Sequence, residues 1–141
     1  MRLGHRRKSL SAFWALTMLV GVLAHSSTIA EDYFLLTSFR GNGEDGLHLA
    51  LSTNGYHWQA LKGDRSFLRS ELGAGLIRDP CVAQGPDGTF HLVWTSGWTT
   101  ESGKVIGYSN SRDLLNWSKP RPISFMENEP RARNIWAPEI F

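Results

Sequence analysis

The sequence has very little cysteine and no helical pattern. Cys81 is the only cysteine among 141 residues, so no disulfide can form within the chain and a hydrophobic core must stabilise the fold. We expect Cys81 to behave as a small hydrophobic side chain rather than as a nucleophile. No segment after residue 30 repeats apolar residues with a helical period. Together with the abundant Trp, Phe and Gly, this absence favours an all-β fold.

The N-terminus lacks an apolar run long enough for an ordinary membrane span. Residues 1–30 start with a basic head, continue through the apolar run 10–24 and end in the small residues 28–30. That order is typical of a secretory signal peptide. We therefore expect residues 1–30 to be cleaved and residues 31–141 to form a secreted or periplasmic domain. An uncleaved N-terminal anchor is the alternative.

Excess positive charge is also missing from the expected domain. The formal charge of +2 includes four basic residues, and no acidic ones, within the first thirty positions. The remainder has 11 Lys and Arg against 13 Asp and Glu, a net charge of −2. Without a basic excess, we expect neither a nucleic-acid partner nor, after cleavage, a membrane partner. A neutral carbohydrate partner is compatible with this net charge, because its binding requires no strong electrostatic field.

Short aromatic and apolar runs alternate with turn signals along residues 31–141. Turns are expected in the Gly-rich segment 41–46, at Asn54-Gly55 and at 85–88, and a loop at 62–75. The runs between them predict strands. The expected strands are 33–39, 47–51, 57–61, 77–83, 89–95 and 104–109, with a further strand starting at 116–118.

These elements repeat along the chain. The segment "LSTNGYHW" ends at Trp58, and the similar segment "YSNSRDLLNW" ends at Trp117. Residues 33–34 in the first unit correspond to 90–91 in the second. A period near 58 with about four strands per unit is typical of β-propeller blades. We expect about two blades, with Trp58 and Trp117 in their cores.

A third pair of positions, Pro80 and Pro138, follows the same period. The innermost strand of each propeller blade faces a central channel, so equivalent positions in successive blades converge on one cavity. Asp79 and Glu139 flank these prolines and are expected to point into that cavity. Two carboxyl groups there are suited to glycoside cleavage, which needs an acid for the leaving oxygen and a base for water.

Four motifs carry a family resemblance, in the order "RDPCV", "GPDGTFHLVWT", "YSNSRDLLNW" and "WAPEIF". The sequence resembles glycoside hydrolase family 43, the five-bladed propeller arabinanases, arabinofuranosidases and xylosidases. The resemblance implies an inverting hydrolase of arabinoside or xyloside linkages in polysaccharides or oligosaccharides. The family's general acid is a glutamate in the blade after "WAPEIF". We therefore expect a truncated domain that lacks this acid and is inactive alone.

The resemblance also assigns roles to individual residues. Asp79 matches the family's general base. Glu139 matches a carboxylate that tunes the pKa of the acid and orients the substrate, although the family usually has aspartate there. We expect Arg78, Trp98 and Trp136 to bind the substrate, since indole rings can stack on the apolar faces of sugars. Arg78 is also a candidate to hold Asp79 by a charge-assisted bond.

Plainer interpretations stand beside these. Asp79 before a proline is also a common turn signal, Glu139 also fits a surface acid, and Arg78 also fits a solvated cation. We expect structural roles for His48, His57 and His91. No cofactor or metal is expected, although a structural calcium near Glu44 and Asp45 stays open despite unsuitable ligand spacing.

Three other functions remain open. A family 32-like propeller glycosidase also has an "RDP" motif, but its upstream "NDPNG"-like nucleophile is absent between residues 31 and 77. A sialidase-like relationship is suggested by "STNGYHW", which resembles the Asp-box turn. A secreted propeller that binds carbohydrate without catalysis would use the same aromatic residues.

Overall fold

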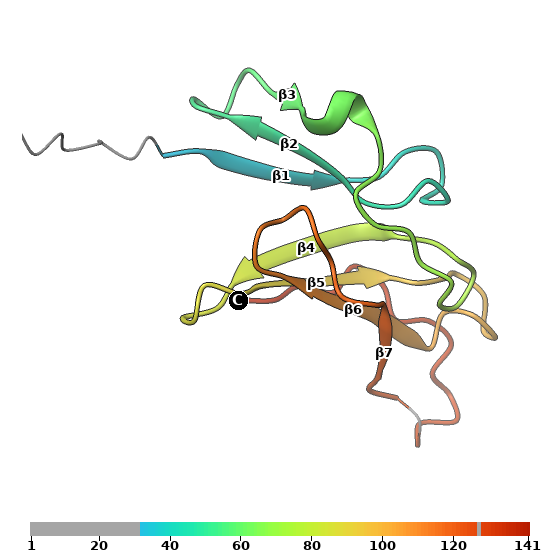
Figure 1. Ribbon diagram of the computed structural model, residues 1–141. Coiled ribbons are helices and arrows are strands. Elements are labelled where there is room, and N and C mark those ends of the chain that lie inside the picture. The colour runs from blue at the N-terminus through green and yellow to red at the C-terminus, as the bar shows by residue number, and fades with distance from the viewer. Residues whose placement is uncertain (1–31, 127) are drawn as a thin grey trace, which may run out of the picture. The chain divides into compact units, whose positions relative to one another are not determined.

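The computed structural model describes residues 32–126 and 128–141, so the expected signal peptide lies outside the described residues. Two antiparallel sheets make up the fold (Figure 1). The first contains β1 (Phe34–Ser38), β2 (His48–Ser52) and β3 (Gln59–Ala60) in that order. The second contains β4 (Arg78–Gln84), β5 (Phe90–Thr95), β6 (Val105–Ser111) and β7 (Arg121–Ser124). The all-β prediction is confirmed.

Six of the seven expected strands coincide with β1 to β6, and their ends differ by only a few residues. The last prediction, a strand starting at 116–118, is wrong, because β7 begins at Arg121 and Trp117 makes only an isolated bridge to Ser111. The expected loop 62–75 contains most of a short 3-10 turn, η1 (Leu61–Asp64). No helix in the described part of the chain is long and apolar enough to cross a membrane.

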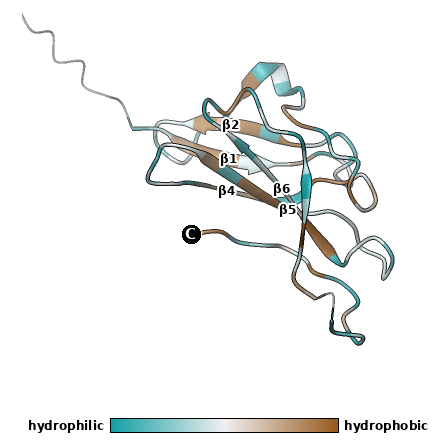
Figure 2. Cartoon of the chain, turned by 60° about the horizontal axis from the view of Figure 1, so that its bottom comes forward, coloured by the Kyte–Doolittle hydropathy of each residue, from teal (hydrophilic) through white to brown (hydrophobic). Residues whose placement is uncertain are grey.

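The main core lies between the two sheets, and hydrophobic stretches are visible on their strands in Figure 2. Side chains alternate across each strand, so one face of every strand can point to this core. Trp94 is fully buried, and its ring lies over Gly107, its cross-strand partner. The buried residues of this cluster are Leu47, Leu49, Ile77, Leu92 and Trp94.

A second apolar cluster covers the other face of the β4–β7 sheet. Val93, Ile106 and Tyr108 are its buried members. Ile135 and Ile140 from the C-terminal segment pack against it. The second sheet therefore has apolar contacts on both faces, as an internal blade of a propeller would. Closure into five blades stays a prediction.

The structure corrects the repeat register. The Thr37 hydroxyl donates to the carbonyl of Pro80, and the Thr95 hydroxyl oxygen accepts from the Ala137 backbone at 2.7 Å. Thr37 and Thr95 have the same spacing in the sequence as Pro80 and Pro138. The alignment of 33–34 with 90–91 is therefore wrong by one position. Such a slip would place equivalent side chains on opposite faces of the sheet, and the register set by Thr37 and Thr95 avoids that.

This register, like the expected alignment, makes β1 the counterpart of β5. β2 and β3 then correspond to β6 and β7, and residues 137–141 correspond to the start of β4. The expectation of about four strands per unit holds for the second sheet only, since the first has three within the described residues.

The two turns that end in tryptophan have one architecture. In the first, the side-chain oxygen of Asn54 accepts hydrogen bonds from the backbone of Tyr56 and His57. The hydroxyl of Ser52 accepts from the backbone of Asn54 and Gly55. These bonds replace ladder hydrogen bonds where the chain reverses, which is the usual role of short polar side chains in turns.

In the second turn, Asp113 takes the place of Asn54 and accepts from the backbone of Leu115 and Asn116. This turn explains the late start of β7, because the backbone N–H of Asn116 still donates its hydrogen bond to the Asp113 side chain. Trp117 packs against the main core, as expected. Trp58 does not: it is 41% exposed. Its predicted place in a blade core is wrong for the described structure, because no sheet covers that side of β1–β3.

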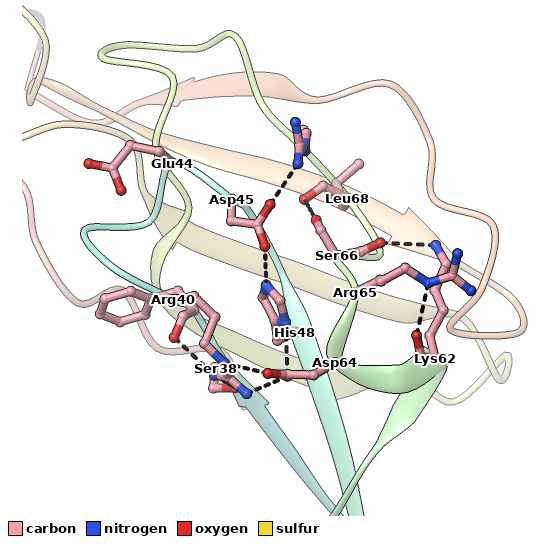
Figure 3. Close-up of polar contacts among 12 residues, drawn as sticks. Ser38, Arg40, Glu44, Asp45, His48, Lys62, Asp64, Arg65, Ser66 and Leu68 are labelled. Carbon is pink, nitrogen blue, oxygen red and sulfur yellow. Dashed lines mark hydrogen bonds and ion pairs between the residues drawn. The ribbon is translucent and has the colours of Figure 1, made fainter.

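A polar network ties β2 to η1 (Figure 3). The His48 side chain is buried, and its ring nitrogens lie 2.9 Å from an Asp45 oxygen and 3.2 Å from an Asp64 oxygen. Arg40 makes two hydrogen bonds to Asp64, and Arg69 bonds to Asp45. Burial of a polar ring is tolerated here because both nitrogens face carboxylate oxygens. His48 is thus part of the framework, as expected.

Candidate active site

Asp79 lies in β4 at an irregularity of the strand pairing. The register with β5 shifts between Arg78 and Cys81, and Asp79 itself has a φ of 47°. A positive φ is uncommon outside glycine, and the residue before a proline such as Pro80 also has restricted conformations. Such backbone strain costs on the order of 1–3 kcal/mol. The bulge turns the Asp79 side chain out of the regular alternation and leaves it exposed.

The same backbone conformation occurs one repeat later. Ala137, which precedes Pro138, also has a φ of 47°. The strained conformation is therefore a property of the repeat and not a mark of catalysis by itself. What distinguishes Asp79 from Ala137 is its carboxylate.

A hollow of about 560 Å³ is lined by both Asp79 and Glu139. Its walls come from β1, from residues 79–82 of β4 and from the C-terminal segment 137–141. Asp79 and Glu139 thus line one hollow although they belong to different repeats. Both side chains are exposed, so solvent and ligands can reach them.

A smaller pocket of about 140 Å³ also includes Asp79. Arg78, Trp98 and Trp136 line it together with Thr95. Trp98 and Trp136 are 46% and 58% exposed, which leaves indole surface free for contact with a ligand. Four of the five residues singled out from the sequence therefore lie around one pocket, and the fifth, Glu139, lines the larger hollow on the other side of Asp79.

Arg78 is positioned by aromatic rings and an amide. Its guanidinium lies 5.5 Å from the ring centre of Phe39 and 5.4 Å from that of Trp98. It donates a 2.7 Å hydrogen bond to the side-chain oxygen of Asn42. The suggested bond from Arg78 to Asp79 is not formed. Because the guanidinium is already engaged, Arg78 acts as a fixed, half-buried cation at the pocket wall.

Sequence reasoning missed the residues that hold Arg78. Phe39 directly follows β1, and Asn42 lies in the next turn, so both are far from the "RDP" motif in the sequence. Gly43 allows the close approach: its φ is 98°, and a Cβ there would lie 2.7 Å from Cγ of Arg78. The cluster of glycines around Asn42 was the available signal, but it also fits an ordinary turn.

The carboxyl groups with lowered pKa values lie outside this site. Backbone and side-chain donors of Asn116 lower the pKa of Asp113, and the hydrogen bond from Arg40 lowers that of Asp64. Backbone and side-chain donation from Thr89 lowers the pKa of Asp87. Within residues 32–126 and 128–141, no group of three or more His, Cys, Asp or Glu side chains is placed to hold a metal ion.

Comparison with known families agrees with the sequence motifs. No significant match to the chain was found among curated proteins or among solved structures. The family model described as "probable glycosyl hydrolase domain", related to glycosyl hydrolase family 43, matches residues 31–141. That range includes both sheets, the 560 Å³ hollow and the pocket beside Asp79. The chain therefore belongs to the glycosyl hydrolase family 43-related proteins.

Proposed function

We propose that this domain takes part in the hydrolysis of O-glycosidic bonds with inversion, using Asp79 as the general base. The observation that carries the proposal is the position of Asp79 between two cavities. One holds Glu139, and the other holds Arg78, Trp98 and Trp136. The family match supports a glycosyl hydrolase.

The exposed tryptophans and the arginine provide a binding surface for a neutral sugar. Trp98 and Trp136 offer apolar indole faces that suit the C–H faces of a sugar ring. The Arg78 guanidinium, held by Asn42 at 2.7 Å, is positioned to donate to sugar hydroxyl groups. We propose an arabinoside or xyloside as the sugar, following the family resemblance.

In this proposal Asp79 removes a proton from water as the water attacks the anomeric carbon. Inversion requires the acid carboxyl about 6.5–9.5 Å from the base, so that the water fits between base and sugar. Glu139 orients the substrate and acts electrostatically from the shared hollow. A further carboxyl group outside the described site acts as the acid. The working location of the domain is proposed to be outside the cytoplasm, because residues 1–30 read as a signal peptide.

Activated substrates test the base without requiring the acid. A dinitrophenyl glycoside has a leaving group that departs without protonation, so general-acid assistance contributes little. We expect the chain to be inactive alone on unactivated glycosides, which need the acid, but to hydrolyse dinitrophenyl arabinofuranoside or xyloside, and to do so faster than the galactoside. Proton NMR of the first product formed should show the inverted anomer. A retained anomer would rule out the single-displacement mechanism.

The carbohydrate-binding alternative predicts a different result. Titration calorimetry would then detect binding of arabino- or xylo-oligosaccharides, and no dinitrophenyl substrate would be turned over above the rate in buffer. The family match favours the hydrolase, and it also favours the family 43 relationship over the family 32-like one.

A further inference from the structure

β1 is paired on one side only. β5 lies between β4 and β6, whereas its counterpart β1 pairs only with β2 among the described residues. Within residues 32–126 and 128–141, the first sheet therefore has no strand equivalent to β4. An unpaired strand edge presents backbone donors and acceptors that can bind another strand.

The C-terminal segment 137–141 corresponds to the start of β4, although it is not a strand in the described structure. It belongs to no sheet in the described structure. Ala137 shares the backbone φ of Asp79. Ile140 packs against the second apolar cluster just as Val82, its counterpart one repeat earlier, packs against the first. The segment thus has the contacts of an innermost blade strand, although no strand pairs with it among the described residues.

The outer face of the first sheet is apolar and uncovered. Phe34 is 54% exposed, Leu36 42% and Trp58 41%. The repeat register gives each of them a counterpart in the second sheet that packs on the main core. These counterparts are Leu92 and Trp94, both fully buried, and Trp117, which is half-buried.

We propose that two copies of this chain join head to tail, with residues 137–141 of one copy pairing antiparallel with β1 of the next. The added strand completes the first sheet as a four-stranded blade. The face carrying Phe34, Leu36 and Trp58 then packs near the second apolar cluster of the first copy, where Ile140 already lies. The two surfaces differ, so the interface is heterologous and leads to a ring or an open chain of copies.

The known pairing of β4 with β5 fixes the expected register. Cys81 lies opposite Val93 in that pair. Glu139 is the counterpart of Cys81 one repeat later, and Leu35 is the counterpart of Val93 one repeat earlier. In the proposed pairing, Glu139 of one copy therefore lies opposite Leu35 of the next. Directly opposed residues in antiparallel strands have Cα atoms roughly 4.5–5.5 Å apart, within the range of about 4.4–6.8 Å that a disulfide spans. The adjacent Phe34 points to the other face of the strand.

Disulfide trapping between two different chains tests this register. Both chains carry Cys81→Ser; one adds Leu35→Cys and the other adds Glu139→Cys. Because each chain then has one cysteine, a Leu35–Glu139 cross-link can form only between copies. After mild oxidation of the mixture, we expect a dimer of the two different chains on non-reducing electrophoresis. Replacing Leu35→Cys by Phe34→Cys should lower the yield at least tenfold.

Light scattering of the unmodified chain provides a readout that does not depend on the variants. We expect a mass of at least two chains, reduced to one chain by excess synthetic peptide of residues 136–141. A monomer in the absence of the peptide, or equal cross-linking through positions 34 and 35, would overturn the proposal. A monomer would also be the result if a strand of the same polypeptide occupied the edge of β1.

Discussion

At the level of single residues, backbone and side chain contribute separately to the candidate site. The positive φ of Asp79 is shared with Ala137, so the repeat requires the bend and Asp79 adds the carboxylate. Asparagine tolerates left-handed conformations about as well as aspartate. A change of Asp79 to asparagine therefore separates the chemistry of the side chain from its structural role.

Gly107 is required by the ring of Trp94. A Cβ at position 107 would lie 1.9 Å from that ring, which is buried and cannot move freely. We predict that Gly107→Ala destabilises the fold by about 3 kcal/mol through overpacking. Urea denaturation followed by tryptophan fluorescence measures the effect.

Gly55→Ala is the matched control. A Cβ at position 55 meets no atom within 4 Å, but its φ of 74° is left-handed. We expect a cost of about 1 kcal/mol from backbone strain alone. Equal losses for the two variants would show that Trp94 does not press against Gly107.

His48 is expected to be the histidine on which stability depends. It is 1% exposed and contacts Asp45 and Asp64. We predict that His48→Ala lowers the free energy of unfolding by about 2 kcal/mol or more, as other large-to-small core substitutions do. The exposed His57 is the control, and His57→Ala should change it by no more than about 0.5 kcal/mol. A larger loss of unfolding free energy in His57→Ala than in His48→Ala would show that the network around His48 lies outside the stable core.

At the level of elements, the two turns before Trp58 and Trp117 differ in one charge. Donors from Asn116 and Leu115 hold the pKa of Asp113 well below its usual range. The ionised form is thus favoured in the folded state. The resulting stability is present above the ordinary aspartate pKa of about 3.9 and is lost as pH falls towards the lowered folded value.

We therefore predict that the melting temperature drops below about pH 4 and that Asp113→Asn makes this drop smaller. The first turn already works with a neutral amide at Asn54, so the fold should survive the change. Circular dichroism melts from pH 7 to pH 2 test this. An unchanged pH dependence in the variant would exclude Asp113 as a main contributor and leave the other carboxyl groups with lowered pKa values, which are Glu44, Asp64, Asp87 and Glu101.

Strands were easier to predict from the sequence than their register. Alternating apolar residues and Asn-Gly or Pro-Asp-Gly turns located β1 to β6, because those signals are local. The correct alignment of the repeats needed the contacts of Thr37 and Thr95, which are not local. Burial of Trp58 could not be predicted from its repeat position, since it depends on whether a neighbouring sheet is present.

The candidate site was likewise predictable where the signals are local and not where they depend on tertiary contacts. The motifs around Asp79 and Trp136 gave five candidate residues, and the structure gathers four of them in one pocket. Asn42 and Phe39, which position Arg78, were not predicted because their contact depends on how β1 lies beside β4. Local patterns reveal chemistry-bearing residues, whereas tertiary packing determines which residues support them.

At the level of the whole molecule, consecutive repeats supply the walls of one hollow. β1, β4 and the segment 137–141 each contribute to it, as the innermost parts of successive propeller blades would. This arrangement explains how Asp79 and Glu139, in different repeats, come to share a cavity. It also means that any catalysis depends on how the repeats are held together.

The most direct test is the turnover of a dinitrophenyl arabinofuranoside or xyloside by the Asp79→Asn variant. We predict a loss of roughly 10²–10⁴-fold, the usual contribution of a general base, with an unchanged circular dichroism spectrum. Glu71→Gln, an exposed carboxylate that lines neither of the two cavities, should retain the full rate. Near-normal turnover by Asp79→Asn would contradict the assignment of Asp79 as the base.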